Sequence, residues 1–268
     1  HLWKYQKNMP IIGAHVSAAG GVYKCFENAK KIGAETIQIF GASPRGWKAV
    51  MPATEVIARY KNEERGSGIG PVFLHAAYLV NLGTVNKQLW HASIASLTSH
   101  LQIAEALGAQ GLIFHIGSAN DGDKREAYVR VAEGMKKVLE AVPGKTQLIM
   151  ENGAAGGSKL GATPEEIGEI FHLVKNSRVK VCWDTQHGFA AGVMKIYSDE
   201  EIDALAKRCQ KTFGLKNLVV LHVNDSKTES GSFNDKHENI GEGKIGLDAF
   251  KRLAKHSHLE KLPWILEV

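Results

Sequence analysis

Residues 111–151 read GLIFHIGSANDGDKREAYVRVAEGMKKVLEAVPGKTQLIME, and this stretch decides the fold class. It begins and ends with a short, nearly continuous apolar run, Gly111–His115 and Gln147–Glu151, and helical periodicity covers Glu126–Leu139 between them. Short apolar runs without alternation are typical of strands buried on both faces of a parallel sheet. The stretch therefore predicts a β-α-β unit, and each of its two strands ends in a residue that can bind a metal ion.

The same pattern recurs along the whole chain, with roughly 25–46 residues between successive strand starts. Eight such units predict an α/β protein with a (β/α)8 barrel, also called a TIM barrel, and a doubly wound open sheet is the alternative. The six further apolar runs are Ile11–Val16, Thr36–Phe40, Val72–His75, Lys180–Asp184, Leu218–Asn224 and Trp264–Glu267. The further helical segments are Val22–Ile32, Leu89–Leu107, Thr163–Val174, Asp199–Thr212 and Leu247–His256.

No linker, low-complexity tract or shift of composition divides the chain, so a single barrel domain is expected over residues 11–268. Residues 1–10 lack an initiator Met and are interpreted as an N-terminal extension or an artificial boundary. Because the last apolar run reaches the end of the sequence, the eighth helix of the barrel is expected to be missing or truncated.

The composition indicates a soluble globular protein, with 44% apolar and 23% charged residues among 268. It excludes disorder, collagen and coiled coil. The net charge of +5 permits an anionic partner without identifying one. Three cysteines without a CxxC pair indicate reduced thiols, and the sequence contains neither a signal peptide nor an apolar run of about 18 residues. We therefore expect a cytoplasmic or otherwise intracellular protein that does not bind membranes.

Residues that can bind metal ions lie at or near the ends of six of the eight apolar runs. The carboxyl ends of all barrel strands face one mouth, so these six side chains are expected to converge there. Three of them are carboxylates, which would repel one another, and no Lys or Arg lies at a comparable strand end. Metal ions are the natural compensation. The six residues are His75, His115, Glu151, Asp184, His222 and Glu267.

Two short spacings extend this set. Asp184 and His187 lie three residues apart where a strand leads into a loop, and Asp235 and His237 lie two apart. Mixed imidazole and carboxylate ligands suit Zn²⁺, and also Mn²⁺ or Fe²⁺. Five His and four acidic residues are too many for one tetrahedral ion, so the sequence predicts two or three metal ions.

These residues lie in motifs that resemble the endonuclease IV family of apurinic/apyrimidinic (AP) endonucleases. The resemblance runs nearly end to end, from Ile12 to Glu267. It implies a (β/α)8 barrel with three zinc ions held by nine side chains, and all nine have a match of the right type here. The motifs are IGAHVSAAGG (12–21), LHAAYLVNLG (74–83), FHIGS (114–118), DTQHGFAAG (184–192), HVNDSK (222–227) and DKHENIGEG (235–243).

The resemblance also assigns the ligands to the three ions, and it leaves open that Mn²⁺ or Fe²⁺ takes one or more positions. Glu151 and Glu267 are in addition expected to orient or deprotonate the attacking water. The first ion is assigned His75 and His115, with Glu151 bridging to the second; the second is completed by Asp184, His222 and Glu267; the third is assigned His187, Asp235 and His237.

The activity implied is hydrolysis of the phosphodiester bond 5′ to an abasic site in double-stranded DNA, a step of base excision repair. Three Zn²⁺ ions and four carboxylates leave a charge of +2, which would balance a hydroxide and a phosphodiester. The mechanism is a hypothesis: a hydroxide shared by two metal ions attacks the phosphorus, and the third ion stabilises the departing 3′ oxygen. The products would be a 3′-hydroxyl and a 5′-deoxyribose phosphate. A monomer is expected.

By the same resemblance, Arg45, Tyr78 and Leu79 are loop residues that enter the DNA beside a flipped-out abasic nucleotide. The alternative for Tyr78 and Leu79 is ordinary loop packing, and from the residues alone Arg45 is equally read as part of a solvated basic loop. The chain departs from the family pattern in the loop Asn152–Gly157 and beside His187. These departures bear on the DNA contacts, since none removes a predicted metal ligand.

Two other functions fit parts of the pattern. A sugar isomerase or epimerase with the same barrel shares a carboxylate-rich mouth and two metal ions. It does not need the pair Asp235 and His237 or an exposed Tyr-Leu tip. A DNA-binding or metal-binding protein without catalysis is the second alternative, and metal-dependent nicking of DNA would decide against it.

Overall fold

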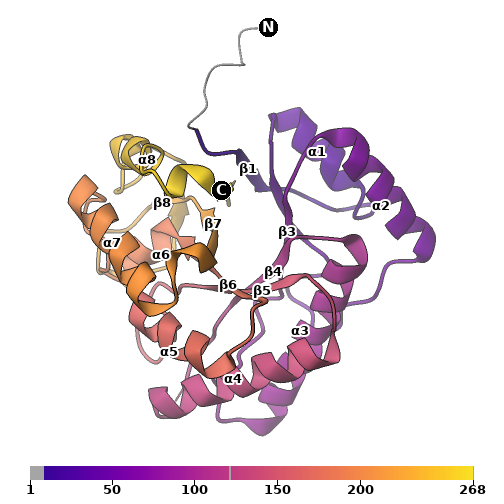
Figure 1. Ribbon diagram of the computed structural model, residues 1–268, viewed down its shortest axis with the longest axis horizontal. Helices are drawn as coiled ribbons and strands as arrows, with labels where there is room; N and C mark the ends of the chain where they lie inside the picture. Colours follow the sequence, from indigo (N-terminus) through magenta and orange to yellow (C-terminus); the bar gives the residue numbers. More distant parts are fainter. Residues whose placement is uncertain (1–8, 121, 268) are drawn as a thin grey trace, which may run out of the picture.

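The computed structural model describes residues 9–120 and 122–267, in which eight parallel strands close into a barrel. The strands neighbour one another in the order β1-β10-β7-β6-β5-β4-β3-β2, and helices surround them (Figure 1). Closure between β1 and β10 excludes the open doubly wound sheet, which has two free edges. The predicted TIM barrel is thus confirmed.

The strands match the apolar runs to within about two residues at either end. Full burial explains this agreement: the whole segments Val72–His75 (β3) and Gly111–Phe114 in β4 are buried on both faces. The remaining barrel strands are β1 (Ile12–His15), β2 (Ile37–Phe40), β4 (Gly111–His115), β5 (Gln147–Glu151), β6 (Val179–Asp184), β7 (Leu218–His222) and β10 (Trp264–Leu266).

Side-chain caps begin several of the helices, as the sequence pattern predicts for the segment after Thr163. The hydroxyl of Thr163 accepts a hydrogen bond from the backbone N–H of Glu166, and Pro164 takes the first helical position. The helices are α1 (Lys24–Ile32), α2 (Thr54–Ser67), α3 (Lys87–Leu107), α4 (Lys124–Ala141), α5 (Pro164–Val174), α6 (Thr185–Ala190), α7 (Asp199–Thr212) and α8 (Leu247–Leu253).

Helices α2 and α6 are not predicted by the sequence pattern. Helix α2, TEVIARYKNEERGS, is largely polar and buries Tyr60, so it has no clear apolar stripe. Helix α6 is short and buried all round, which hides its period. Neither helix therefore shows the apolar periodicity that predicts an amphipathic helix. The two-stranded ribbon formed by β8 (Asp225–Ser226) and β9 (His237–Glu238) was not predicted either.

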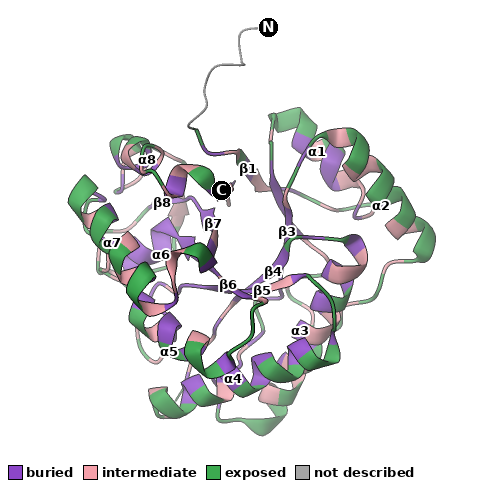
Figure 2. Ribbon diagram, in the orientation of Figure 1, coloured by how far each residue is buried: buried purple, intermediate pink, exposed green. Residues whose placement is uncertain are grey.

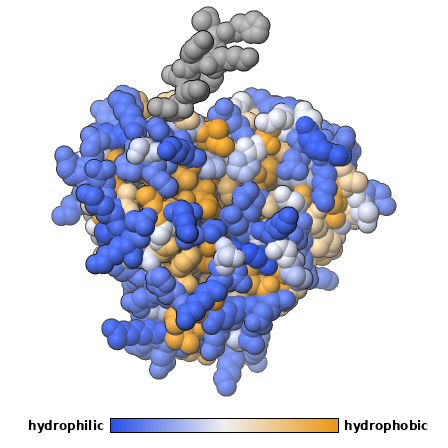
Figure 3. Space-filling model, viewed as in Figure 1, coloured by the Kyte–Doolittle hydropathy of each residue, from blue (hydrophilic) through white to orange (hydrophobic). Residues whose placement is uncertain are grey.

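The core has two parts. The larger part lies between the strands and the inward faces of the helices, whose outward faces are exposed (Figure 2). Hydrophilic side chains dominate the rim of the face seen in Figure 3. The smaller part lies inside the barrel and receives one side chain from each of six strands: Phe73, Ile113, Ile149, Cys182, Val220 and Ile265.

The three cysteines are free and buried, in agreement with reduced thiols. Among the described residues, no helix combines the length and the apolar character that crossing a bilayer requires. The predicted extension over residues 1–10 falls almost entirely outside the described residues.

Candidate metal centre

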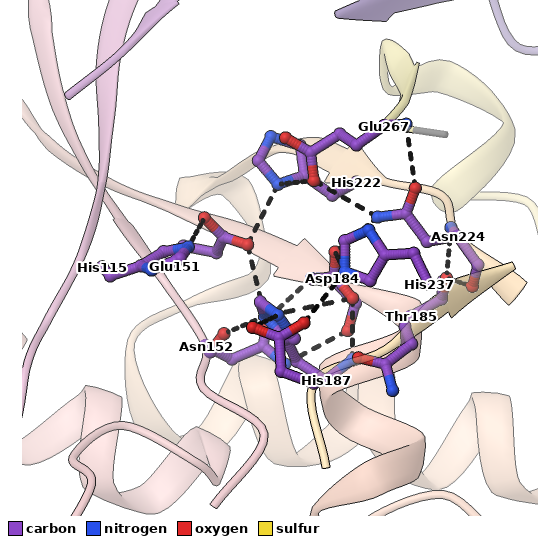
Figure 4. Close-up of polar contacts among 12 residues, drawn as sticks. His115, Glu151, Asn152, Asp184, Thr185, His187, His222, Asn224, His237 and Glu267 are labelled. Atoms are coloured by element: carbon purple, nitrogen blue, oxygen red, sulfur yellow. Dashed lines mark hydrogen bonds and ion pairs between the residues drawn. The ribbon is translucent and has the colours of Figure 1, made fainter. Parts of the chain in front are cut away.

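The barrel brings the six predicted strand-end ligands to one mouth. Each follows a side chain of the inner apolar cluster by two residues, as Glu151 follows Ile149 and His222 follows Val220. Because side chains alternate along a strand, residues two apart face the same side, here the barrel interior. Glu151, Asp184 and His222 consequently point toward one another (Figure 4).

The ligand atoms form three overlapping groups, and within each group all of them lie within 4.8 Å of one another. Glu151 belongs to two groups and Asp184 to two, so these carboxylates stand between neighbouring positions. The Nε2 atoms of His75 and His115 lie 3.1 and 3.2 Å from the same Glu151 oxygen. The groups are His75, His115 and Glu151; then Glu151, Asp184, His222 and Glu267; then Asp184, His187 and His237.

Asp235, which sequence analysis placed with His187 and His237, lies against the third group. Its carboxylate oxygens are 3.2 Å from His187 Nε2 and 3.3 Å from His237 Nε2. Asp235 is on the loop before β9, and β9 carries His237. All nine residues that the resemblance assigns as ligands thus lie close together at one mouth of the barrel.

The charges of this cluster fit bound cations. Each ion pair that the described residues make with Glu151, Asp184, Asp235 or Glu267 involves a histidine, and none involves Lys or Arg. Burial raises the pKa of Asp184 despite the histidines near it. Within the described part of the chain, no contact of the buried His187 Nε2 atom has hydrogen-bond geometry, although an Asp235 oxygen lies 3.2 Å away. An acidic site whose imidazole nitrogens face carboxylates suits Zn²⁺ or a similar ion.

The carboxylates also raise the pKa of two of the histidines. Burial by itself lowers the pKa of His187, but Asp184, Asp235 and Glu151 raise it well above its usual value. In the same way, the hydrogen bond to Asp235 and the charge of Asp184 raise the pKa of His237 to about 9 against the effect of burial. The site therefore attracts positive charge strongly, which divalent ions would supply in place of these protons.

Backbone carbonyls fix which nitrogen of two histidines is free. His75 donates its Nδ1–H to the carbonyl of Ala76 at 2.8 Å, and His187 donates its Nδ1–H to the carbonyl of Asn152 at 2.8 Å. In both rings, Nε2 is then left facing the carboxylates. Such hydrogen bonds are the usual means by which a protein orients histidine ligands.

Two asparagines that sequence analysis did not single out support Asp184. The Asn152 side chain accepts from the Asp184 backbone N–H at 2.6 Å and donates to the Asp184 carbonyl at 3.1 Å. Asn224 donates to the Asp184 carboxylate at 2.6 Å and to Glu267 at 3.3 Å. Each asparagine follows a predicted ligand at a strand end, Asn152 by one residue and Asn224 by two. This position was the only feature of the sequence that could have predicted their role.

A third unpredicted residue, Asp225, organises the loop after His237. Its buried carboxylate accepts hydrogen bonds from the backbone N–H groups of Gly241, Gly243 and Ile245 at 2.9, 3.1 and 2.9 Å. Asp225 also pairs with Glu238 across the β8–β9 ribbon. The loop that follows His237 is thereby tied to the ribbon that carries His237.

Six of the nine predicted ligands line a cavity of about 620 Å³, together with His15, Phe40 and Tyr78; the six are His75, His115, His187, Asp235, His237 and Glu267. A neighbouring cavity of about 250 Å³ extends between Tyr78 and Lys159. Burial, the largest effect, lowers the pKa of His15 to about 4, so its ring is neutral near pH 7. The cavity is therefore lined by acidic side chains together with aromatic rings and the neutral ring of His15.

Of the predicted DNA-contacting residues, Tyr78 lines both cavities, Leu79 lines the smaller one, and Arg45 lines neither. Tyr78 is 56% exposed and Leu79 is 38% exposed, so neither is packed into the core as an ordinary loop anchor would be. Arg45 is exposed on the neighbouring loop, and the Tyr78 N–H donates to the carbonyl of Pro44 at 3.0 Å. The two loops therefore form one connected edge beside the ligands.

Comparison with known proteins places this arrangement in a family. Residues 26–268 match the family described as xylose isomerase-like TIM barrel. A probable endonuclease 4 of Halothermothrix orenii is 36% identical over 257 residues, which cover 96% of this chain and 92% of that protein. The chain belongs to the endonuclease IV family. The family predicted from the motifs is thus confirmed, and with it the expectation that the protein is an enzyme, an endonuclease.

Solved structures agree with this family. The crystal structure of endonuclease IV from Thermus thermophilus has a TM-score of 0.85 and 35% identity, and the match covers 97% of this chain and 92% of that one. A D-tagatose 3-epimerase-like protein matches with a TM-score of 0.71 but only 15% identity, which shows a common fold alone. The second match therefore gives no support to the sugar epimerase alternative.

Proposed function

We propose that the chain hydrolyses the phosphodiester bond 5′ to an abasic site in double-stranded DNA and leaves a 3′-hydroxyl and a 5′-deoxyribose phosphate. This activity would serve base excision repair. The observation that supports it is the gathering of nine imidazole and carboxylate side chains at one mouth of the barrel, where six of them line an open cavity beside an exposed Tyr-Leu tip. Membership in the endonuclease IV family supplies the reaction class.

The proposed cofactor is a set of three zinc ions, with Mn²⁺ or Fe²⁺ as possible occupants. When bound, they would lower the pKa of water to about 7 and stabilise negative charge on the phosphate oxygens. Two of the three overlapping ligand groups match the proposed positions, with Glu151 shared between them. For the third, we propose Asp235 as a ligand beside His187 and His237, because its carboxylate reaches both rings.

The two proposed catalytic carboxylates differ in access to the cavity. The side chain of Glu151 is 1% exposed and lies among four histidines, whereas that of Glu267 is 17% exposed and lines the cavity. Glu267 is therefore the better placed of the two to accept a proton from the attacking water. Glu151, held between His75 and His222, is better suited to fix the positions of the ligands around it.

DNA recognition is proposed to use the rim. An abasic nucleotide has already lost its pairing, so its displacement into the 620 Å³ cavity costs less than for an intact nucleotide. Tyr78 and Leu79 would fill the space left in the duplex, and exposed Arg45 would contact a phosphate. The basic net charge of +5 is compatible with such a partner. A monomer would suffice, because one chain carries the whole ligand set.

The test is nicking of a duplex oligonucleotide with one abasic site, with product ends analysed by gel mobility. The expected result is a single cut on the 5′ side, abolished by EDTA and restored by zinc. A matched duplex without the abasic site is the control and should stay intact. Ketose isomerisation with no nicking would support the epimerase alternative instead.

A further inference from the structure

The inner face of the barrel contains one buried amide that the proposed ligand set does not use. Gln38 lies in β2 and is fully buried, and the register pairs it with Phe73, a member of the inner apolar cluster. A glutamine at that level costs free energy unless its amide is hydrogen-bonded. The contacts of Gln38 therefore explain why a polar side chain is tolerated there.

Both ends of the Gln38 amide contact proposed ligands. Its Nε2 donates to Glu267 Oε1 at 2.7 Å, and its Oε1 lies 2.8 Å from His222 Nε2. The second N–H hydrogen of the amide is available for the Nδ1 atom of His15, at 3.0 Å. One side chain of β2 thus connects β1, β7 and the residue after β10.

The chemistry of the partners fixes the orientation of the amide. A carboxylate only accepts hydrogen bonds, so the NH₂ group must face Glu267 and the carbonyl oxygen must face His222. That oxygen can only accept, so His222 must carry a hydrogen on Nε2. The opposite nitrogen, Nδ1, lies 3.1 Å from Glu151 and 3.3 Å from Glu267, on the side of the carboxylates.

We propose that Gln38 is a positioning residue for one metal ion: it directs His222 Nδ1 and the Glu267 carboxylate toward the site that they share with Glu151 and Asp184. Asn224 completes the arrangement from the other side, because it donates to the second Glu267 oxygen at 3.3 Å. Glu267 is thereby held by two amides, one on each oxygen. This inference rests on the metal-dependent function proposed above.

The position of Gln38 separates its role from DNA binding. It is fully buried below the cavity, while Tyr78 and Leu79 form the exposed rim. Loss of the amide should therefore weaken the binding of one metal ion and slow the chemical step, without changing the affinity for DNA. Removal of a hydrogen-bond partner behind a metal ligand typically costs about 10–100-fold in metal affinity or activity.

The experiment compares zinc release from the wild-type protein, Gln38→Met and Gln38→Asn during titration with a chelator, with the remaining zinc counted by elemental analysis. Met keeps the length without the amide, and Asn keeps the amide but is too short to reach both partners. The matched control is Gln147→Met, at the opposite end of β5 from Glu151. Circular dichroism verifies folding, and steady-state nicking gives kcat and KM.

We expect both Gln38 variants to release one zinc equivalent at about 10–100-fold lower chelator concentration, while the other equivalents and the Gln147→Met profile follow wild type. The kcat should fall by a similar factor with KM unchanged. A wild-type release profile in a folded Gln38 variant, an equal weakening of all zinc equivalents, or failure of both variants to fold would overturn the proposal. A wild-type protein that binds zinc without nicking abasic DNA would contradict only the proposed function.

Discussion

Two layers of side chains inside the same barrel behave in opposite ways. The lower layer is the apolar cluster defined above, with Ile149 and Val220 among its members, and the upper layer consists of the six strand-end ligands. Each upper residue follows its lower neighbour by two positions, so both layers have the same backbone geometry. The two layers therefore differ in side-chain chemistry alone. An offset of two residues along each strand is enough to separate a packed apolar layer from the proposed metal site.

The lower layer also conditions the upper one. Its apolar side chains exclude water beneath Glu151 and Asp184, whose side chains are 1% and 0% exposed. In such surroundings the attraction between a carboxylate and a cation is less screened than in water. The apolar layer thus stabilises the fold, and at the same time it would strengthen the binding of the proposed ions above it.

The largest effect is expected from a change in the upper layer. Glu267→Gln keeps the shape of the side chain but removes its charge, and activity on abasic DNA should fall by about 1,000-fold or more, because several kcal/mol of transition-state stabilisation are lost. Glu151→Gln should behave in the same way. The measurement is single-turnover nicking, with circular dichroism as the control for folding. Wild-type nicking by both variants would remove these residues from the reaction.

Removal of the metal should distinguish the roles of the two layers without any substitution. Dialysis against EDTA should abolish nicking and leave the barrel folded, because the lower layer and the outer core do not depend on ions. Zinc at about 1,000 times its Kd should then add about 4 kcal/mol to the free energy of unfolding. Urea titration with and without zinc measures this difference. Identical unfolding curves would argue that the cluster binds no zinc.

A change in the lower layer should have the reverse effect and reduce stability more than activity. Ile149→Ala opens a cavity in this layer and should lower the free energy of unfolding by about 2–5 kcal/mol. Because Glu151 keeps its position on the strand, kcat of the folded protein should change much less than in Glu267→Gln. Urea unfolding and steady-state nicking measure the two effects. A loss of activity as large as that of Glu267→Gln would mean that the two layers are not separable.

The smallest effect is expected at the rim, away from both layers. Arg45→Ala should weaken binding of abasic duplex modestly and reduce the slope of log affinity against log salt by about one phosphate contact. Titration of a fluorescent duplex at several salt concentrations measures the slope. Zinc content is the control and should not change. An unaltered slope would assign Arg45 to the solvated surface.

The strands and their terminal ligands could be predicted from the sequence because full burial leaves a local record. A strand such as Gly111–His115 is apolar at almost every position, and the ligand at its end interrupts that run. Helix α2 left no such record, because its side chains are mostly exposed. Gln38 was also missed, since a single polar residue in an apolar run does not reveal its partners.

By itself, the sequence determined the β-α repeat, the strand ends and the type of residue at each of them, because these depend on local periodicity and burial. Only the tertiary structure decided which of these residues meet. Gln38 and Glu267 lie 229 positions apart in the chain, yet their side chains are 2.7 Å apart. Barrel closure produces that contact, since it places β10 beside β1 and so brings the residue after β10 near β2, and no local pattern records a distance across the barrel.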